Sequence, residues 1–232
     1  MDQLPSWALA NTATAFATLF GGVFPVLFCW VIGRQPLRWL FVYWMIVLTG
    51  ILTITLHGFG QTNPILGERW FWSFLDTGSN IVVTWAIALA VLWDYYHKAT
   101  RRWAIPLMTL IMIVGIAGHY YERLPSTGAI HVVSLGFWGG FCPGEFSLIT
   151  FAWINVLLFG LKWRRIPKKA RPALLLIVGV FLIGLLTATA SDDLVVYPFF
   201  SIHAIWHVIG AFGFITLWAF NHVRFSGEER AM

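Results

Sequence analysis

Apolar positions in this chain run together in long blocks instead of alternating regularly with polar ones. A helix needs roughly 20 mostly apolar residues to cross the hydrocarbon core of a bilayer. Seven blocks have about that length: residues 10–33, 39–59, 70–94, 103–121, 144–162, 172–190 and 200–222. The pattern therefore predicts an all-α integral membrane protein, folded as one seven-transmembrane-helix bundle over residues 1–232.

The composition agrees with this reading. The chain is 59% hydrophobic and 11% charged, with a mean hydropathy of +0.75, whereas soluble domains carry about 25% charged residues. It has too few polar side chains to cover a water-exposed surface, which excludes a soluble enzyme. The net charge of +5 does not indicate nucleic-acid binding, because the basic residues lie in short connections between apolar blocks. We expect a multi-pass protein whose surroundings are the lipid bilayer.

The basic residues also predict the orientation. On one side they lie in three short connections and the tail, at 34–38, 95–102, 163–171, Arg224 and Arg230. Only Arg69 and Arg123 fall on the other side. Because lysine and arginine accumulate in cytoplasmic loops, we expect the N-terminus outside and the C-terminus in the cytoplasm.

Three features of the connections and the N-terminus complete this topology. The first residues lack the basic region of a signal peptide, so the block 10–33 is expected to be retained as a helix. Cys29 and Cys142 are expected near opposite faces of the membrane, which predicts no disulfide between them. The connection 122–143 is longer than the others and rich in glycine and aromatic residues, so it is a candidate re-entrant or interfacial lid.

Four ionisable residues share one predicted depth. His57 is near the outer end of the second block, Asp76 is about two turns into the third, and His203 and His207 open the seventh. At 1.5 Å per residue, all four lie within roughly 10 Å of the outer boundary. Such residues are costly in hydrocarbon and mark functional sites. Their common depth predicts a single site near the non-cytoplasmic face.

Three of these residues have the chemistry of zinc ligands. His203 and His207 are four positions apart, which places them on one face of a helix. With His57 they supply three imidazoles and leave the fourth position of a tetrahedral zinc ion open, as in catalytic zinc sites. An isolated histidine near a membrane interface is commonly a packing residue, so the prediction depends on the shared depth.

Asp76, Thr53 and Ser79 are candidates for the surrounding groups. Asp76 is expected to act as a general base or to hold a ligand imidazole by a hydrogen bond. Thr53 lies one turn before His57, and Ser79 three residues after Asp76. Their hydroxyls are candidate donors to a substrate carbonyl. The alternative for both is a hydrogen bond to their own helix backbone.

Other polar residues near the outer face are expected to lie outside this site. His119 and Glu122 close the fourth block and His131 follows it. They are candidates to line an entrance or to bind a lipid headgroup, but we expect them to be exposed at the interface. Glu145 and Asn155, in the fifth block, have no partner that the sequence identifies.

The histidine late in the second block, L-D-T-G-S-N-I in the third and H-A-I-W-H-V-I-G-A-F-G in the seventh resemble the CREST superfamily of seven-helix membrane hydrolases. The chain is closest in kind to the alkaline ceramidases, whose N-outside orientation is similar, and more distant from the adiponectin-receptor (progestin and adipoQ receptor) proteins. The resemblance covers the topology and three short motifs. Thr53 stands where the family usually has serine.

The resemblance implies a zinc-dependent amidohydrolase that cleaves a ceramide-like or other acylated membrane lipid within the bilayer. By motif position, His57, His203 and His207 would bind zinc and Asp76 would hold the catalytic water. The oligomeric state stays open.

Two other classes of protein use similar residues. A haem-binding electron carrier would clamp iron between two histidines, such as His57 and His203, but imidazoles four positions apart on a helix lie on one side of a metal. A proton or metal-ion transporter, or a receptor, would use the same cluster. A transporter would need polar groups towards the cytoplasmic side, where the blocks 39–59 and 200–222 are expected to be largely apolar.

Overall fold

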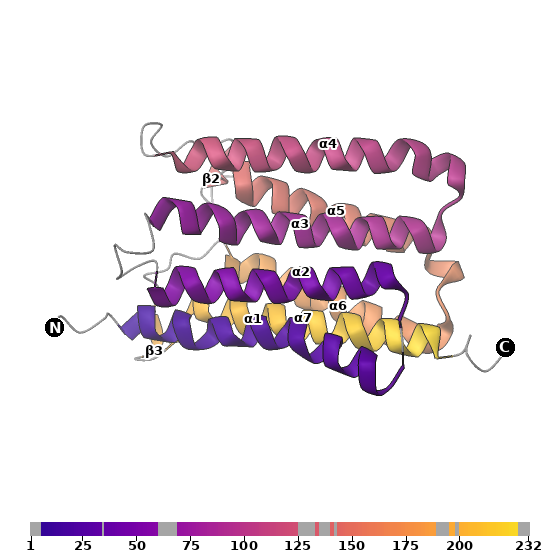
Figure 1. Cartoon of the computed structure of the whole chain (residues 1–232), viewed down its shortest axis with the longest axis horizontal. Helices are drawn as coiled ribbons and strands as arrows, with labels where there is room; N and C mark the ends of the chain where they lie inside the picture. Colours follow the sequence, from indigo (N-terminus) through magenta and orange to yellow (C-terminus); the bar gives the residue numbers. More distant parts are fainter. Residues whose placement is uncertain are drawn as a thin grey trace. The chain divides into compact units, whose positions relative to one another are not determined.

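The computed structural model describes residues 6–33, 35–59, 69–124, 133–134, 140–141, 143–188, 195–197 and 200–226. For residues 6–9, 58–59, 69, 133–134, 140–141, 145, 185–188, 195–197 and 200–203 it describes the backbone alone. The long helices of this part are α1 (Ser6–Val31), α2 (Leu37–Ile54), α3 (Arg69–Tyr95), α4 (Lys98–Arg123), α5 (Pro143–Leu161), α6 (Arg171–Ala188) and α7 (Ile202–Phe225), shown in Figure 1. Short turns of helix are η1 (Thr55–Phe59), η4 (Trp163–Arg165) and η5 (Lys168–Ala170).

The helical character predicted from the sequence is confirmed, and the length and composition of the helices support a membrane-embedded protein. Each of the seven apolar blocks coincides with one long helix. Within the described residues, five helices are long and apolar enough to cross a membrane, over Ala10–Val31, Leu37–His57, Trp70–Tyr95, Lys98–Arg123 and Ala204–Phe225. The apolar part of α5 is shorter, at Phe146–Leu161. Seven crossings and the N-outside orientation stay predictions.

Short strands that the sequence did not predict lie in two connections. β1 (Val133–Ser134) pairs antiparallel with β2 (Gly140–Phe141), and β3 (Val195–Tyr197) pairs antiparallel with β4 (Phe200–Ser201). The first pair lies in the connection 122–143. The rest of that connection between Leu124 and Pro143, including Cys142 and His131, is outside the described residues. The predictions of a lid and of no disulfide between Cys29 and Cys142 concern that part and stay predictions.

The chain divides into two compact units. Unit 1 is Met1–Leu66 with Ile166–Met232, and unit 2 is Gly67–Arg165. Unit 1 therefore contains α1, α2, α6 and α7, and unit 2 contains α3, α4 and α5. The prediction of a single domain stays a prediction.

In unit 1, α1 packs against both α2 and α7, and α7 also packs against α6 (Figure 1). Glycines allow α1 to lie close to α2 and α7. A Cβ atom on Gly22 would lie 2.5 Å from the backbone nitrogen of Val47, and one on Gly21 would lie 2.9 Å from Cα of Ala211. Small residues at helix contacts are typical of membrane bundles, because without a hydrophobic driving force helices associate through close packing.

In unit 2, α3 packs against α4 and α5, and α4 packs against α5. Asn155, for which the sequence identified no partner, donates from Nδ2 to the carbonyl of Thr84 on α3 at 2.8 Å. It also donates to the carbonyl of Phe151 on its own helix at 3.0 Å. The amide thus connects α5 to α3, and such hydrogen bonds between helices help to hold membrane bundles together.

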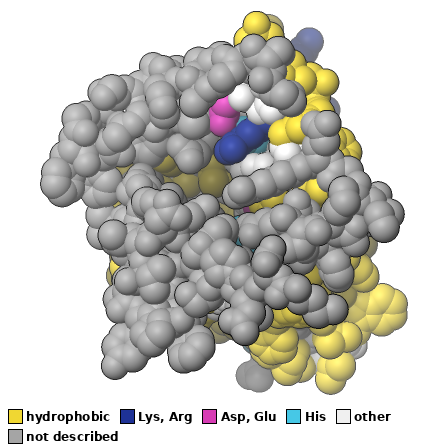
Figure 2. All heavy atoms as spheres, turned by 90° about the vertical axis from the view of Figure 1, so that its left-hand side faces the viewer, with side chains coloured by type: hydrophobic (Ala, Val, Ile, Leu, Met, Phe, Trp, Pro, Cys, Tyr) yellow, Lys and Arg dark blue, Asp and Glu magenta, His cyan; other side chains and the backbone are white. Residues whose placement is uncertain are grey.

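Large apolar side chains cover much of the outside of the described residues. Trp103 on α4 and Leu161 on α5 are each at least three-quarters exposed, and the coloured flanks in Figure 2 are mainly hydrophobic. A soluble monomer rarely exposes apolar surface in such continuous areas. The exterior therefore supports helices that face lipid.

Candidate functional site

His57 lies in a π-helical turn. α2 ends at Ile54, and the backbone continues through η1 (Thr55–Phe59) with the wider spacing of a π-helix. Single π turns inside helices are rare and occur frequently at functional sites. The His57 side chain is buried, with 6% of its surface exposed. The turn therefore places an imidazole inside unit 1 at the end of α2.

The π turn is attached to α1 by Thr12. The hydroxyl of Thr12 donates a hydrogen bond of 2.8 Å to the backbone carbonyl of His57. Thr12 was not among the site residues predicted from the sequence. A signal was present, because Asn11 and Thr12 are polar residues in the first apolar block at the depth predicted for His57. Asn11 is fully buried.

His207 lies next to His57. It is one turn into α7 and 5% exposed. The centroids of the two imidazole rings are 5.0 Å apart, and the rings are inclined at 72° to each other. The structure thus brings together two predicted ligands from helices that are far apart in the sequence.

The third predicted ligand is His203. Its backbone lies in α7, one turn before His207, and its side chain is outside what the structure describes. Among the described residues, no group of three or more His, Cys, Asp or Glu side chains is arranged to hold a metal ion. The separation of the two described ring centroids is compatible with a shared ion, because with Zn–N bonds of about 2 Å two such rings have centroids roughly 5 Å apart.

Thr53 is buried one turn before His57, with 1% of its surface exposed. Its hydroxyl donates to the backbone carbonyl of Thr49 at 2.9 Å. This is the local hydrogen bond considered above as the alternative role. A threonine hydroxyl has a single proton, so in this rotamer Oγ1 offers a substrate an acceptor and not a donor.

Asp76 and Ser79 lie on α3 in unit 2. Asp76 is half-buried about two turns from the start of the helix. Its backbone carbonyl accepts hydrogen bonds from Ser79 Oγ at 2.7 Å and from Asn80 Nδ2 at 3.1 Å. The Ser79 hydroxyl is thus also bonded to its own helix. The histidines belong to unit 1, so the placement of Asp76 as their general base stays a prediction.

The expectation that His119 and Glu122 are exposed at the interface is wrong. His119 is fully buried, and the Glu122 side chain is 4% exposed. His119 Nδ1 lies 3.3 Å from Glu122 Oε2, and the backbone N–H of Gly144 donates to the same oxygen at 3.2 Å. Arg123 Nε lies 3.3 Å from Glu122 Oε1.

This cluster joins the end of α4 to the start of α5. Gly144 is in the first turn of α5, where a carboxylate is favoured by the unpaired N–H groups and the helix dipole. The His119 ring stacks on Phe74 of α3, with centroids 5.7 Å apart. Hydropathy gave no sign of this burial, but the three-residue spacing of His119 and Glu122 on one helix face was a usable signal.

A second polar cluster lies in unit 1 where α2 begins and α7 ends. The Tyr43 hydroxyl donates to Gln35 Oε1 at 2.8 Å and accepts from Asn221 Nδ2 at 3.0 Å. All three side chains are buried. The blocks 39–59 and 200–222 are largely apolar, as expected, and Tyr43 and Asn221 are buried polar exceptions at this end of unit 1.

Arg224 belongs to the same end of unit 1. The charge pattern assigned it to the cytoplasmic tail, but it lies in the last turn of α7 and is 6% exposed. Its guanidinium carbon is 4.2 Å from the ring centroid of Phe225 and 5.3 Å from that of Trp39. Cation–π contacts of this kind favour a buried guanidinium.

No protein-family model matches the chain, and no curated protein or solved structure matches it significantly. A functional proposal therefore depends on the residues described above and on the resemblance of the three short motifs.

Proposed function

We propose that this chain is an intramembrane zinc-dependent hydrolase that cleaves an amide bond of a ceramide-like or other acylated lipid. The observation that carries the proposal is the His57–His207 pair. Both imidazoles are buried, and their ring centroids are 5.0 Å apart. Buried imidazoles in a membrane bundle are costly unless they have a role, and their separation suits a shared zinc ion. His203, one turn before His207, would be the third ligand.

The proposed chemistry assigns a role to each group. Zinc bound by the three histidines would polarise the amide carbonyl and lower the pKa of a water molecule. Asp76 would accept a proton from the attacking water and deliver it to the amine nitrogen as the C–N bond breaks. Thr53 would accept a hydrogen bond from the substrate and so help to orient it. The products would be a fatty acid and a lipid amine.

Metal analysis of the purified chain tests the proposal. We expect about one zinc ion per chain, with most of it lost in His57→Ala and in His207→Ala. His222→Ala is the matched control, because His222 lies on α7 stacked against Trp218 at 5.2 Å, away from the pair. A Soret band would indicate haem instead. Zinc content unchanged in both variants, or no zinc in the wild type, would contradict the proposal.

The polar cluster of Gln35, Tyr43 and Asn221 favours one second candidate, a proton or metal-ion transporter. With the histidine pair it places buried polar groups at both ends of unit 1, and such groups are typical of ion pathways in membranes. Proteoliposomes with an internal pH or zinc indicator separate the two functions. Flux that Asn221→Leu abolishes would favour the transporter, and amide hydrolysis without flux would favour the hydrolase.

A further inference from the structure

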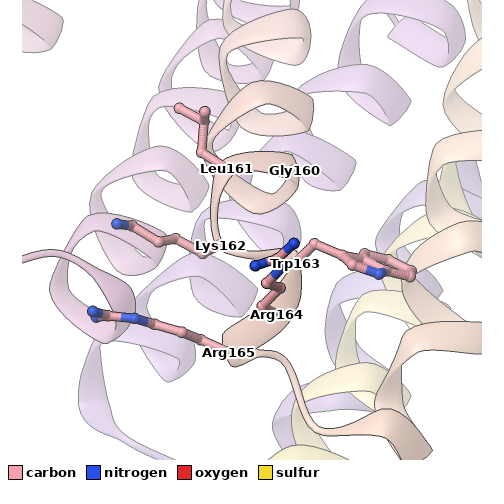
Figure 3. A pocket seen from close by; sticks show the side chains of 6 residues that line it. All are labelled: Gly160, Leu161, Lys162, Trp163, Arg164 and Arg165. Carbon is pink, nitrogen blue, oxygen red and sulfur yellow. The ribbon is translucent and has the colours of Figure 1, made fainter.

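The end of α5 and the following turn η4 form a pocket of about 320 Å³. Gly160, Leu161, Lys162, Trp163, Arg164 and Arg165 line it (Figure 3). The pocket belongs to unit 2 and contains none of the residues of the proposed zinc site. Its walls combine the apolar end of a long helix with three cationic side chains.

The cations of the pocket have no acidic partner within the described part of the chain. Lys162, Arg164 and Arg165 lie within four positions of one another, and no ion pair there involves them. The side chains of Lys162 and Arg165 extend to the same side, and Trp163 points the other way (Figure 3). Like charges this close repel one another, so an anion at this place would be stabilised.

Two of the cations are held in position by the end of α3. Lys162 Nζ lies 4.4 Å from the ring centroid of Tyr96, and Arg165 Nη1 donates to the carbonyl of Tyr95 at 3.2 Å. The Tyr96 hydroxyl in turn donates to the carbonyl of Leu158 at 2.9 Å. A phenol is protonated at neutral pH, and burial raises the pKa of Tyr96 further, so this hydrogen bond does not depend on pH in the neutral range.

These contacts preorganise the pocket. A lysine ammonium has three N–H donors and an arginine guanidinium has five, so each side chain keeps further donors beyond the contacts just described. Side chains that are already ordered lose less entropy when a ligand binds. Cations that served only to orient the chain in the membrane would not need such anchoring.

We propose that this pocket binds the phosphate of an anionic phospholipid headgroup. Arginine and lysine together are well suited to a phosphate, which arginine can bind through two parallel hydrogen bonds. Leu157 and Leu161 are exposed on α5 beside it, where acyl chains of a bound lipid would lie. Tryptophan such as Trp163 is common at the level of lipid headgroups, and basic clusters next to a membrane span attract anionic lipids.

A lipid is favoured over a soluble phosphate because the pocket is at the end of an apolar helix with exposed leucines. The proposal is independent of the zinc site, because it rests on other residues in the other unit. The zinc analysis can therefore contradict the proposed function while lipid binding is observed, and the reverse result is equally distinguishable.

Native mass spectrometry of the full chain tests the proposal, with mixed micelles of phosphatidylglycerol and phosphatidylcholine as the probe. We expect the wild type to retain phosphatidylglycerol in preference. The double variant Arg164→Gln/Arg165→Gln should bind at least about tenfold more weakly, because the loss of even one hydrogen bond to a charged group has an effect of that size. Arg164→Gln alone should weaken binding in the same direction, and because Arg164 is exposed this variant should fold normally.

The matched control is Lys168→Gln/Lys169→Gln, which removes two exposed charges from the next turn, η5, but leaves the pocket lining intact. An equal loss in this control would show a general charge effect and overturn the proposal. Complete displacement of the lipid by millimolar inorganic phosphate would identify a soluble-phosphate site and also overturn it. Equal retention of phosphatidylcholine and phosphatidylglycerol by the wild type would do the same.

Discussion

Thr12 on α1 donates a hydrogen bond of 2.8 Å to the backbone carbonyl of His57, 45 positions away in the chain. In a π turn the backbone hydrogen bonds are displaced from the α-helical pattern, so carbonyls near its end need other donors. Thr12 supplies one from a neighbouring helix. The direction of the His57 imidazole therefore depends on how α1 packs, as well as on α2 itself.

The first prediction follows from this contact. Thr12→Val keeps the shape of the side chain but removes the hydroxyl, so the π turn loses its connection to α1. We expect zinc affinity to fall at least about tenfold, as it does when outer hydrogen-bond partners of metal ligands are removed. Thr12→Ser should restore most of the affinity. A zinc titration against a competing chelator measures the effect.

Thr14→Val is the matched control for Thr12→Val. Thr14 is on the same helix, but its hydroxyl donates to the carbonyl of Ala10 within α1 at 2.8 Å. If both valine variants lost zinc equally, the cause would be a general disturbance of α1. If the wild type bound zinc and Thr12→Val bound it as tightly, Thr12 would have no positioning role.

The second prediction concerns Asp76. Asp76→Asn keeps the size of the side chain but removes the proton acceptor, so we expect zinc to be retained and amide hydrolysis to fall about 10²–10⁴-fold, the usual contribution of a general base. Ser79→Ala should keep turnover within a few-fold, because the Ser79 hydroxyl is bonded to the Asp76 carbonyl. Turnover with a labelled ceramide analogue measures both. Full activity of Asp76→Asn would exclude the general-base role.

Hydropathy was sufficient to locate the helices because the thickness of the hydrocarbon core requires about 20 consecutive apolar residues in a spanning helix. The block 70–94 corresponds closely to Arg69–Tyr95. The block 103–121 was too short, because α4 begins at Lys98 and runs through basic residues that a hydropathy window rejects. The change to a π turn at Thr55 was not visible in the local sequence. It is accompanied by a hydrogen bond from Thr12 on α1, a contact between residues 45 positions apart.

Depth along the helices was sufficient to associate His57 with His207. It was not sufficient for His119 and Glu122, because an ionisable residue at the end of an apolar block has the same hydropathy value whether water or protein surrounds it. Their burial depends on pairing with each other and on Gly144 across the helix contact. Such tertiary partners are not visible in a single sequence.

The third prediction tests the contact between α1 and α2. A Cβ atom on Gly50 would overlap the backbone of Leu19, so Gly50→Ala must push the helices apart. Overpacking of this kind costs about 1–3 kcal/mol. We expect a lower melting temperature in detergent and weaker zinc binding, because the same contact holds Thr12 near His57. Circular dichroism during heating measures the first effect.

Gly179→Ala on α6 is the matched control, since no described atom lies within 4 Å of the Cβ that it would add. It should leave the melting temperature unchanged or raise it, because alanine favours a helix more than glycine does. Equal melting temperatures of Gly50→Ala and Gly179→Ala would mean that α1 and α2 are not in such close contact.

The fourth prediction concerns the buried cluster between α4 and α5. A Cβ atom on Gly144 would overlap the ring of His119, so Gly144→Ala should displace either the imidazole or the start of α5. That movement would break the hydrogen bond from the Gly144 N–H to Glu122 and leave a buried carboxylate with one donor fewer, at a cost of about 1–3 kcal/mol. The melting temperature should fall. Gly160→Ala, on the same helix with open space at its Cβ, should leave it unchanged.

A double variant separates steric overlap from the loss of glycine itself. In His119→Ala the ring is absent, so adding Gly144→Ala to it should cost much less than Gly144→Ala costs in the wild type. The difference between the two costs is the interaction energy of the pair. An equal cost in both backgrounds would mean that His119 does not lie against Gly144. The buried cluster would then need a different packing of α4 on α5, in which the Glu122 carboxylate finds its donors elsewhere.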